Sequence, residues 1–184
     1  MIATLLLSGL VLGCGGTPMD QQIPVNRGRG YQRPIDTLGM ETPIDARADK
    51  IWSVLPAVLT DLGLTVNFRE PAAFRTGTCY QRLRLRLGRE LLSTFIDCGE
   101  TVSRPNADRY EIALTVLITV RPTGENRASV FTFVLGVALD ASGAASNRLW
   151  CYSKGGIEER IRAGIEHHLA EGGGELWSPR IGPE

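Results

Sequence analysis

Histidine and cysteine are scarce in this chain. Among 184 residues there are two histidines and four cysteines, and no C-x-x-C spacing occurs. Metal centres draw their ligands from clusters of these residues, so the sequence predicts no metal site and no cofactor. An excess of positive charge is also missing, because the net charge is zero. The chain therefore lacks the electrostatic footprint of a nucleic-acid-binding protein.

The sequence also lacks the residue patterns that are typical of an active site. The two histidines, His167 and His168, fall in the last turn of a predicted helix, where a cation suits the helix dipole. Carboxylates such as Asp97 and Glu100 are numerous, but no spacing marks an acid–base pair. Gly155-Gly156 follows a predicted strand without the lysine and the spacing of a phosphate-binding loop. We predict no catalytic residue and no enzymatic activity.

An apolar run, Ile2–Leu12, opens the chain. A membrane-spanning helix needs about 20 residues, so this run is too short, whereas its length is typical of the hydrophobic region of a signal peptide. No Lys or Arg precedes the run, which leaves open a start codon further upstream. The alternative is a buried N-terminal helix or strand that ends in an ordinary cysteine.

The run ends in Leu10-Val11-Leu12-Gly13-Cys14, which resembles the lipobox of bacterial lipoproteins. In that family the cysteine receives a diacylglyceryl thioether, the peptide before it is cleaved, and the new N-terminus is acylated. The resemblance implies a signal peptide over residues 1–13 and lipidation of Cys14. Each buried CH₂ of an acyl chain contributes about 0.8 kcal/mol, so the membrane anchor would be firm. Gly15, not Asp, follows Cys14, and by resemblance to proteobacterial sorting this implies the periplasmic face of the outer membrane.

The mature chain divides into three parts. Residues 14–34 are rich in Gly, Pro, Gln and Arg, a composition typical of a flexible tether. Residues 35–171 are predicted to form a single domain, in which Ile35–Ile44 contributes a short edge strand. Three consecutive glycines then end the last helix and begin a C-terminal tail over residues 172–184.

The centre of the domain is a predicted β-hairpin. Two β-branched and aromatic runs, Arg109–Arg121 and Arg127–Leu139, are separated by the five residues Pro122–Asn126. If Arg121 faces Arg127, one face carries large residues opposite small ones, as a core face should. The second face is not clearly polar, and it carries Leu117, Phe131, Phe133 and Leu135. We predict that this second face is covered, either by another part of the chain or by a partner.

Helices flank the strands. Apolar spacing predicts a helix over Asp45–Leu62 that stops at Gly63, and a second helix after Ser153 with a stripe of residues every fourth position: Ile157, Ile161, Ile165 and Leu169. Shorter strands are predicted over Leu64–Arg69, Phe74–Leu87, Leu92–Cys98 and Arg148–Tyr152.

Arginines alternate with leucines along one of these strands. Arg82, Arg84 and Arg86 fall on one side, and Leu83, Leu85 and Leu87 fall on the other. Guanidinium groups suit phosphates and carboxylates, so the arginines either meet such a partner or form a solvated outer face.

The order helix, antiparallel strands, helix predicts an α+β fold: a curved antiparallel sheet with a long central hairpin, packed by two helices in a two-layer, helix-grip-like arrangement. Over most of Ile44–Leu169 this order, together with the lipid anchor, loosely resembles the helix-grip domains found in a lipoprotein of the outer-membrane barrel assembly machinery. The resemblance implies an accessory role in envelope assembly.

With Cys14 lipidated, three thiols remain in an oxidising compartment, where disulfides are permitted. Cys79 and Cys98 would face each other across a hairpin that turns at Gly88. Alternatively, Cys98 pairs with Cys151 and pins the last helix to the sheet, closing a loop of about 50 residues for which the entropy model gives roughly 4 kcal/mol. Two segments, Asp97-Cys98-Gly99 and Cys151–Glu158, resemble pieces shared by a group of bacterial envelope lipoproteins without a known activity, and this resemblance favours the Cys98–Cys151 pair.

Three hypotheses for function follow. The first is a lipid-anchored interaction or assembly module whose second sheet face docks on another envelope protein. The second is a carrier of a small apolar ligand, held in a closed cavity of some hundreds of Å³ between the first helix and the sheet. An enzyme is the third and the least favoured. The expected partners are the membrane, through the lipid anchor, and an envelope protein, with no nucleic acid.

Overall fold

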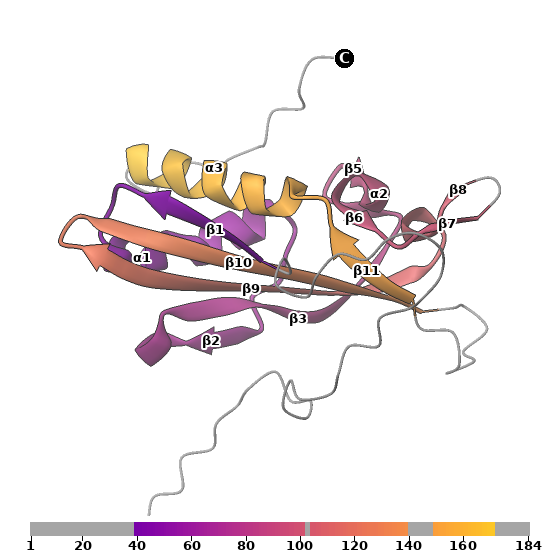
Figure 1. The fold of residues 1–184 in the computed structure, drawn as a ribbon, viewed down its shortest axis with the longest axis horizontal. Coiled ribbons are helices and arrows are strands. Elements are labelled where there is room, and N and C mark those ends of the chain that lie inside the picture. Colours follow the sequence, from indigo (N-terminus) through magenta and orange to yellow (C-terminus); the bar gives the residue numbers. More distant parts are fainter. Residues whose placement is uncertain (1–38, 102–103, 140–148, 172–184) are drawn as a thin grey trace, which may run out of the picture. The chain divides into compact units, whose positions relative to one another are not determined.

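The computed structural model describes residues 39–101, 104–139 and 149–171. The predicted signal peptide, tether and C-terminal tail lie outside the described residues. The described part of the chain has the predicted α+β fold (Figure 1). Its elements are β1 (Gly39–Ile44), α1 (Ala48–Asp61), β2 (Phe68–Glu70), β3 (Arg75–Arg84), β4 (Arg86–Leu87), β5 (Glu90–Leu91), α2 (Leu92–Phe95), β6 (Ile96–Asp97), β7 (Glu100–Thr101), β8 (Arg104–Pro105), β9 (Glu111–Gly124), β10 (Arg127–Leu139), β11 (Leu149–Ser153) and α3 (Gly156–Ala170).

The main sheet is antiparallel and has the strand order β2-β3-β9-β10-β11-β6. The strand β1 pairs with the first half of β10, over Ala128–Phe133, while β11 pairs with the second half, over Leu135–Ala138. Both strands therefore lie along the same side of β10. Pro43 in β1 suits a strand at an edge, where a missing N–H costs no ladder hydrogen bond.

The central hairpin β9–β10 confirms the predicted pair of long strands but corrects its register. The turn contains two residues, Glu125 and Asn126, instead of five, and Val130 faces Val120. The predicted five-residue loop places Val130 opposite Ile118, two residues away. Because side chains alternate with a period of two, a shift of two residues leaves every side chain on the face predicted for it. A register irregularity at Arg127/Ala128 separates the turn from the regular part of the ladder.

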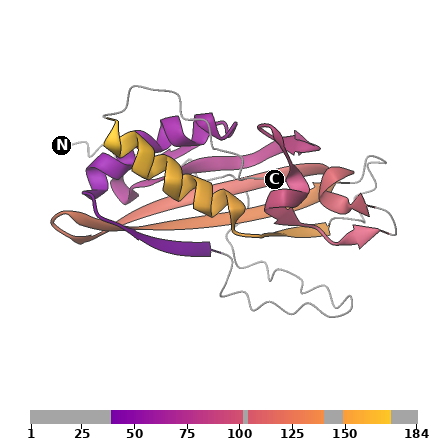
Figure 2. The ribbon, with the colours of Figure 1, turned by 90° about the horizontal axis from the view of Figure 1, so that it is seen from above.

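One face of the sheet and both long helices form the hydrophobic core. Residues from this face, among them Ile112, Leu114, Val116 and Ile118, are fully buried. The stripe of α1 (Ile51, Leu55, Val58, Leu59) and that of α3 (Ile157, Ile161, Ile165) lie in the same cluster. Figures 1 and 2 show α1 and α3 over the same side of the sheet. The arrangement has two layers, as predicted.

The end of α1 confirms the predicted role of Gly63. Gly63 has φ +77, and its N–H donates to the carbonyl of Thr60 (2.9 Å). The N–H of Leu64 donates to the carbonyl of Leu59 (2.8 Å). These two bonds form a Schellman motif, which ends a helix with a residue in the left-handed region and is most easily made by glycine.

Several shorter predictions are wrong. The segment Leu92–Cys98 is not one strand: its first half forms α2, and only Ile96–Asp97 is strand. Leu64–Arg69 forms a strand only from Phe68 onward. Leu85 does not share the buried side of its strand with Leu83 and Leu87, because its backbone has φ +66 and its side chain is exposed. The last helix follows Ser153, as predicted, and Gly155 is its N-cap residue.

Candidate functional site

The face of the sheet opposite the helices carries many large apolar side chains. The pairing of the strands places the following residues on it: Phe68, Leu117, Phe131, Phe133, Leu135, Val137, Trp150 and Tyr152. None of them belongs to the core cluster beneath α1 and α3. We call these eight residues the open face, because neither of the two long helices of the described chain packs on it.

Burial differs across the open face. Phe68 and Phe133 are buried, at 8% and 9% exposure, while the other six are partly exposed. Phe131 lies against the backbone of Gly39: a Cβ at Gly39 would fall 2.3 Å from the end of the Phe131 ring. A side chain at position 39 would therefore displace this ring. The face is thus broad and apolar, and two of its aromatic side chains are buried.

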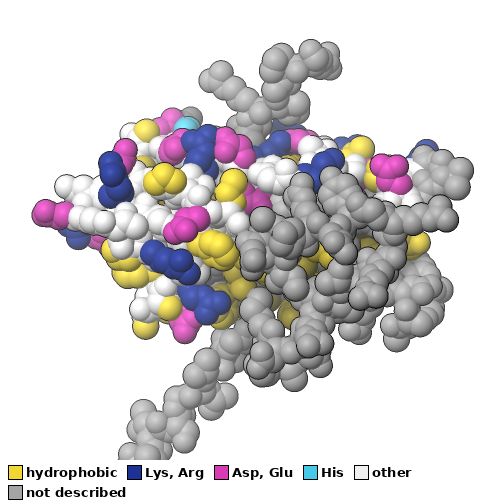
Figure 3. All heavy atoms as spheres, viewed as in Figure 1, with side chains coloured by type: hydrophobic (Ala, Val, Ile, Leu, Met, Phe, Trp, Pro, Cys, Tyr) yellow, Lys and Arg dark blue, Asp and Glu magenta, His cyan; other side chains and the backbone are white. Residues whose placement is uncertain are grey.

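Arginines line the open face. The Arg75 guanidinium lies 5.7 Å from the Phe68 ring centroid, and that of Arg121 lies 5.7 Å from the Phe131 ring centroid. Arg82 and Arg84 both contact Glu111, at 2.8 and 3.3 Å. Figure 3 shows hydrophobic side chains on the lower side of that view, next to basic and acidic side chains. Aromatic residues and arginine are the types enriched where proteins bind one another.

A second feature is an open groove of about 760 Å³ beside α1 and the end of α3, lined by Asp45, Ala46, Arg47, Lys50, Ser53, Val54, Ala57, Asn126, His168 and Leu169. In its wall, His168 Nε2 lies 2.8 Å from Asp61 Oδ2, and both side chains are 4% exposed. Arg47, one of the lining residues, donates two hydrogen bonds to Asp49 and lowers the pKa of that carboxyl below its ordinary value. The buried His168–Asp61 pair joins α1 to α3.

The groove does not match the cavity that a carrier of apolar ligands requires. Its lining includes Lys50, Arg47 and Asp45, and it opens to solvent. The ligand was predicted to lie between the first helix, α1, and the sheet. That position is occupied by side chains with no exposed surface, such as Leu55, Val58 and Leu114. Closely packed side chains leave little room for a ligand. Within the described ranges, no group of three or more His, Cys, Asp or Glu residues is placed to hold a metal ion.

Cys98 and Cys151 are joined by a disulfide bond, with an S–S distance of 2.03 Å and a Cα–Cα distance of 4.1 Å. This bond excludes the alternative Cys79–Cys98 pair. Both residues are buried, and the sheet makes room for them at Gly136, where a Cβ would lie 2.9 Å from Cys151 Cβ. The disulfide is therefore part of the core, where it holds β11 beside the end of β6.

The segment Cys151–Glu158 has structural contacts throughout. The Ser153 hydroxyl donates to the buried carboxylate of Glu158 (2.7 Å) and accepts from the Gly155 N–H (3.0 Å). Lys154 Nζ donates to the Ser93 carbonyl (2.9 Å). Gly155 has φ +88, and a Cβ at Gly156 would lie 3.2 Å from the Phe95 ring. These contacts hold the start of α3 against α2. A structural role is therefore sufficient to explain the residues found in this segment.

The structure brings the four predicted interaction residues together on the open face: Leu117, Phe131, Phe133 and Leu135. Leu117 directly faces Phe133. Phe68, Trp150 and Tyr152 also belong to this face but were not predicted. They come from β2 and β11, and the sequence pattern did not give the register of these strands. The predicted lipidation site, Cys14, lies outside the described residues.

Comparison with protein-family models and with curated proteins finds no match for this chain. Among the described residues, no helix has both the length and the apolar character needed to cross a bilayer.

Proposed function

We propose that this chain is a lipid-anchored interaction module of the bacterial cell envelope, and that its open face binds another envelope protein. The observation that carries the proposal is the open face itself, with eight large apolar side chains on the side of the sheet away from the two long helices. An antiparallel sheet that has one wet face usually shows polar residues on it. An apolar face of this size is typical of a surface that binds a partner.

The chemistry of the face also supports a protein partner. Five of its eight side chains are aromatic, and Arg75 and Arg121 lie over two of the rings. Flat aromatic and guanidinium surfaces bury large areas with few rotatable bonds, which limits the entropy lost on binding. In this proposal, acyl chains on Cys14 keep the domain close to the membrane, at the periplasmic face of the outer membrane.

The competing hypotheses have less support. A carrier requires a closed apolar cavity, and buried side chains fill the interface where the ligand was expected. For enzymatic activity, the buried His168–Asp61 pair would need a nucleophile or a substrate-binding group beside it. Its described contacts instead join two helices.

Site-specific photo-crosslinking in cells tests the docking surface. A photo-reactive amino acid replaces Leu117, Phe131 or Leu135 on the open face, and Glu166 on the exposed side of α3 serves as the control. We expect adducts of one defined mass from the three open-face positions and none of that mass from position 166. Adducts that are equal at all four positions would contradict the proposal, as would the absence of any adduct from the open face.

Lipidation is tested separately by mass spectrometry of the protein extracted from its own membranes. The expected result is acyl mass on Cys14, and loss of membrane recovery in the Cys14→Ser variant. A full-length chain without acyl mass would refute the anchor while leaving the docking surface to the crosslinking result.

A further inference from the structure

The large hydrophobic side chains that are exposed in the described structure fall within one short stretch of chain. They are Tyr80, Leu85 and Leu91, at 57%, 44% and 38% exposure. Tyr80 lies in β3, Leu85 between β3 and β4, and Leu91 at the end of β5. Figures 1 and 2 show β5 and α2 at the end of the sheet away from the β9–β10 turn.

The backbone turns two of these side chains outward. Tyr80 has φ +54 and Leu85 has φ +66, a region that residues with a side chain rarely adopt. At Tyr80, β3 carries a bulge between Thr78 and Gln81, and the side chain of Asn67 bonds to both the N–H and the carbonyl of Cys79. Bulges commonly redirect a side chain.

Leu85 and Leu91 are neighbours. The Leu92 N–H donates to the Leu85 carbonyl (2.9 Å), and Leu91 faces Arg86 across the β4–β5 pair. In an undisturbed strand, Leu85 would point inward with Leu83 and Leu87. Leu85 instead has a left-handed backbone and an exposed side chain. Two exposed aliphatic side chains therefore come from adjoining parts of the β4–β5 hairpin.

Arginines flank these two leucines in the sequence. Residues 80–91 contain four arginines and one glutamate, a net charge of +3 in a chain whose total charge is zero. The glutamate, Glu90, forms a close ion pair with Arg160 from α3. Arg82 and Arg84 contact Glu111 but keep side-chain exposures of 73% and 71%. The segment combines exposed leucines with solvent-accessible guanidinium groups.

We propose that this segment, here called the Tyr80–Leu91 tip, docks on the surface of a bilayer that contains anionic phospholipid. Acyl chains just below the headgroups accept Leu85 and Leu91, while phosphates accept the guanidinium groups. Tyr80 suits the same depth, because its ring is apolar and its hydroxyl is polar. A protein partner is better matched by the aromatic open face than by two leucines. The tip acts without the acyl anchor, so this inference does not depend on Cys14.

Vesicle partitioning tests the proposal on the full chain carrying Cys14→Ser, so that no acyl chain contributes. Vesicles of phosphatidylcholine with 30% phosphatidylglycerol are compared with pure phosphatidylcholine. The variants are Leu85→Ser with Leu91→Ser, and Arg84→Gln with Arg86→Gln. The control, Arg47→Gln with Lys50→Gln, removes the same charge from the groove. All variants share residues 1–38. Any binding through that segment is therefore common to each variant and its parent, and it cancels when their partition coefficients are compared as a ratio.

We expect each tip variant to lose at least five-fold in partitioning to the anionic vesicles, and the control to stay within two-fold of the parent. Equal partitioning of all variants would overturn the proposal. A loss confined to the arginine variant would also overturn it, because attraction to charge alone does not involve the leucines. Unchanged melting temperatures verify that the variants are folded.

Fluorescence of a Leu91→Trp variant provides a second test that keeps an apolar side chain at the tip. Vesicles with brominated acyl chains should quench this protein more than they quench its parent. Equal quenching of the two proteins would show that residue 91 stays in water, and the proposal would fail.

Discussion

Gly77 shows how closely two strands of the sheet approach each other. A Cβ at this position would lie 2.0 Å from the Val116 carbonyl oxygen and 3.0 Å from Leu117 Cα, both backbone atoms of β9. Backbone cannot move aside as the end of a flexible side chain can. We predict that Gly77→Ala lowers the free energy of unfolding by about 1–3 kcal/mol or more, measured by urea denaturation.

Gly124→Ala is the matched control, because a Cβ there meets only Arg127 Cβ, at 3.8 Å. This variant should stay within about 0.5 kcal/mol of wild type. Equal losses in the two variants would mean that the contact with Val116 does not decide the effect.

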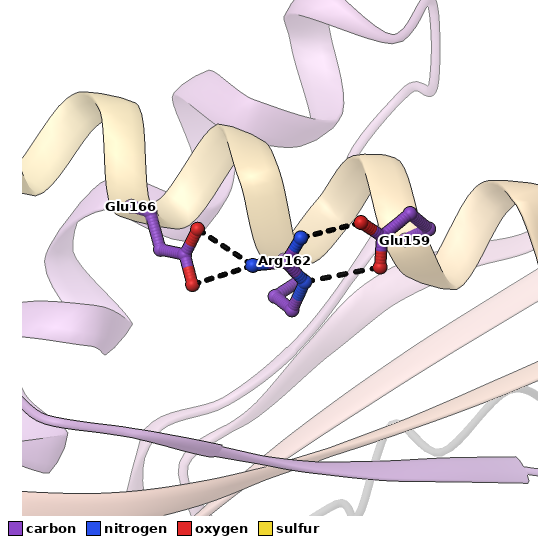
Figure 4. A network of polar contacts seen from close by, with 3 residues as sticks. All are labelled: Glu159, Arg162 and Glu166. Atoms are coloured by element: carbon purple, nitrogen blue, oxygen red, sulfur yellow. Dashed lines mark hydrogen bonds and ion pairs between the residues drawn. The ribbon is translucent and has the colours of Figure 1, made fainter.

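At the scale of the element, α3 carries an exposed ion-pair triad. Arg162 lies between Glu159, one turn before it, and Glu166, one turn after it (Figure 4). Its Nη1 is 2.7 Å from the nearest Glu166 oxygen, and its Nε is 3.0 Å from Glu159 Oε2. The bonds from Arg162 lower the pKa of the Glu159 carboxyl below its ordinary value of 4.5.

This lowered pKa sets the pH dependence of an Arg162→Gln variant. The stabilisation is fully present above pH 4.5 and is lost as the pH falls through the lower pKa of the folded state. Because the pair is exposed, we expect a loss of only about 0.3–1 kcal/mol at pH 7. Thermal unfolding from pH 7 to pH 2.5 should show the two proteins converge at the acid end. A difference that persists there would assign the effect to something other than the ion pair.

A second prediction at the scale of the element concerns the disulfide bond. Cys98 and Cys151 are 53 residues apart in the chain, and their bond joins the end of β6 to β11. Restricting the unfolded chain over such a loop contributes about 4 kcal/mol in the entropy model, and removal of a native disulfide typically costs about 2–5 kcal/mol. We predict a loss in this range for Cys98→Ala with Cys151→Ala, measured by urea denaturation without reductant. Equal stability of variant and wild type would refute it.

Side-chain alternation explains why the faces of the hairpin were predictable although its register was not. A shift of two residues preserves both faces, so Leu117, Phe131, Phe133 and Leu135 share one face in either register. The register irregularity at Arg127/Ala128 does not change the hydrophobic alternation of the sequence. Leu117 and its three neighbours could therefore be predicted as a site without knowledge of the turn.

Two other features were beyond pattern reasoning. The helix α2 has only four residues, and its buried residues are Leu92 and Phe95. Four residues are too few to distinguish the helical period from the alternation of a strand. Leu85 continues a regular Leu–Arg alternation, and nothing in it indicates a backbone with φ +66. The exposed tip is visible only in the structure, because a left-handed leucine contradicts the local preference of the chain.

At the scale of the whole molecule, the two-layer architecture predicts that the same substitution has different effects at two adjacent residues. Val116 and Leu117 are neighbours in β9, but Val116 is fully buried beneath the helices and Leu117 is partly exposed on the open face. An unpaired carboxylate in the core costs several kcal/mol, so Val116→Asp should unfold the domain. Leu117→Asp should cost only about 1 kcal/mol.

Circular dichroism and thermal unfolding of the two variants measure this difference between the faces. The strand, the backbone pairing and the introduced side chain are the same in both, so only the side of the sheet differs. Tolerance of Leu117→Asp together with loss of the partner adduct would show that the open face can be reached by a partner and is used for binding. If Leu117→Asp instead unfolds the domain as completely as Val116→Asp, the open face is a second core, and the proposed docking surface has to be abandoned.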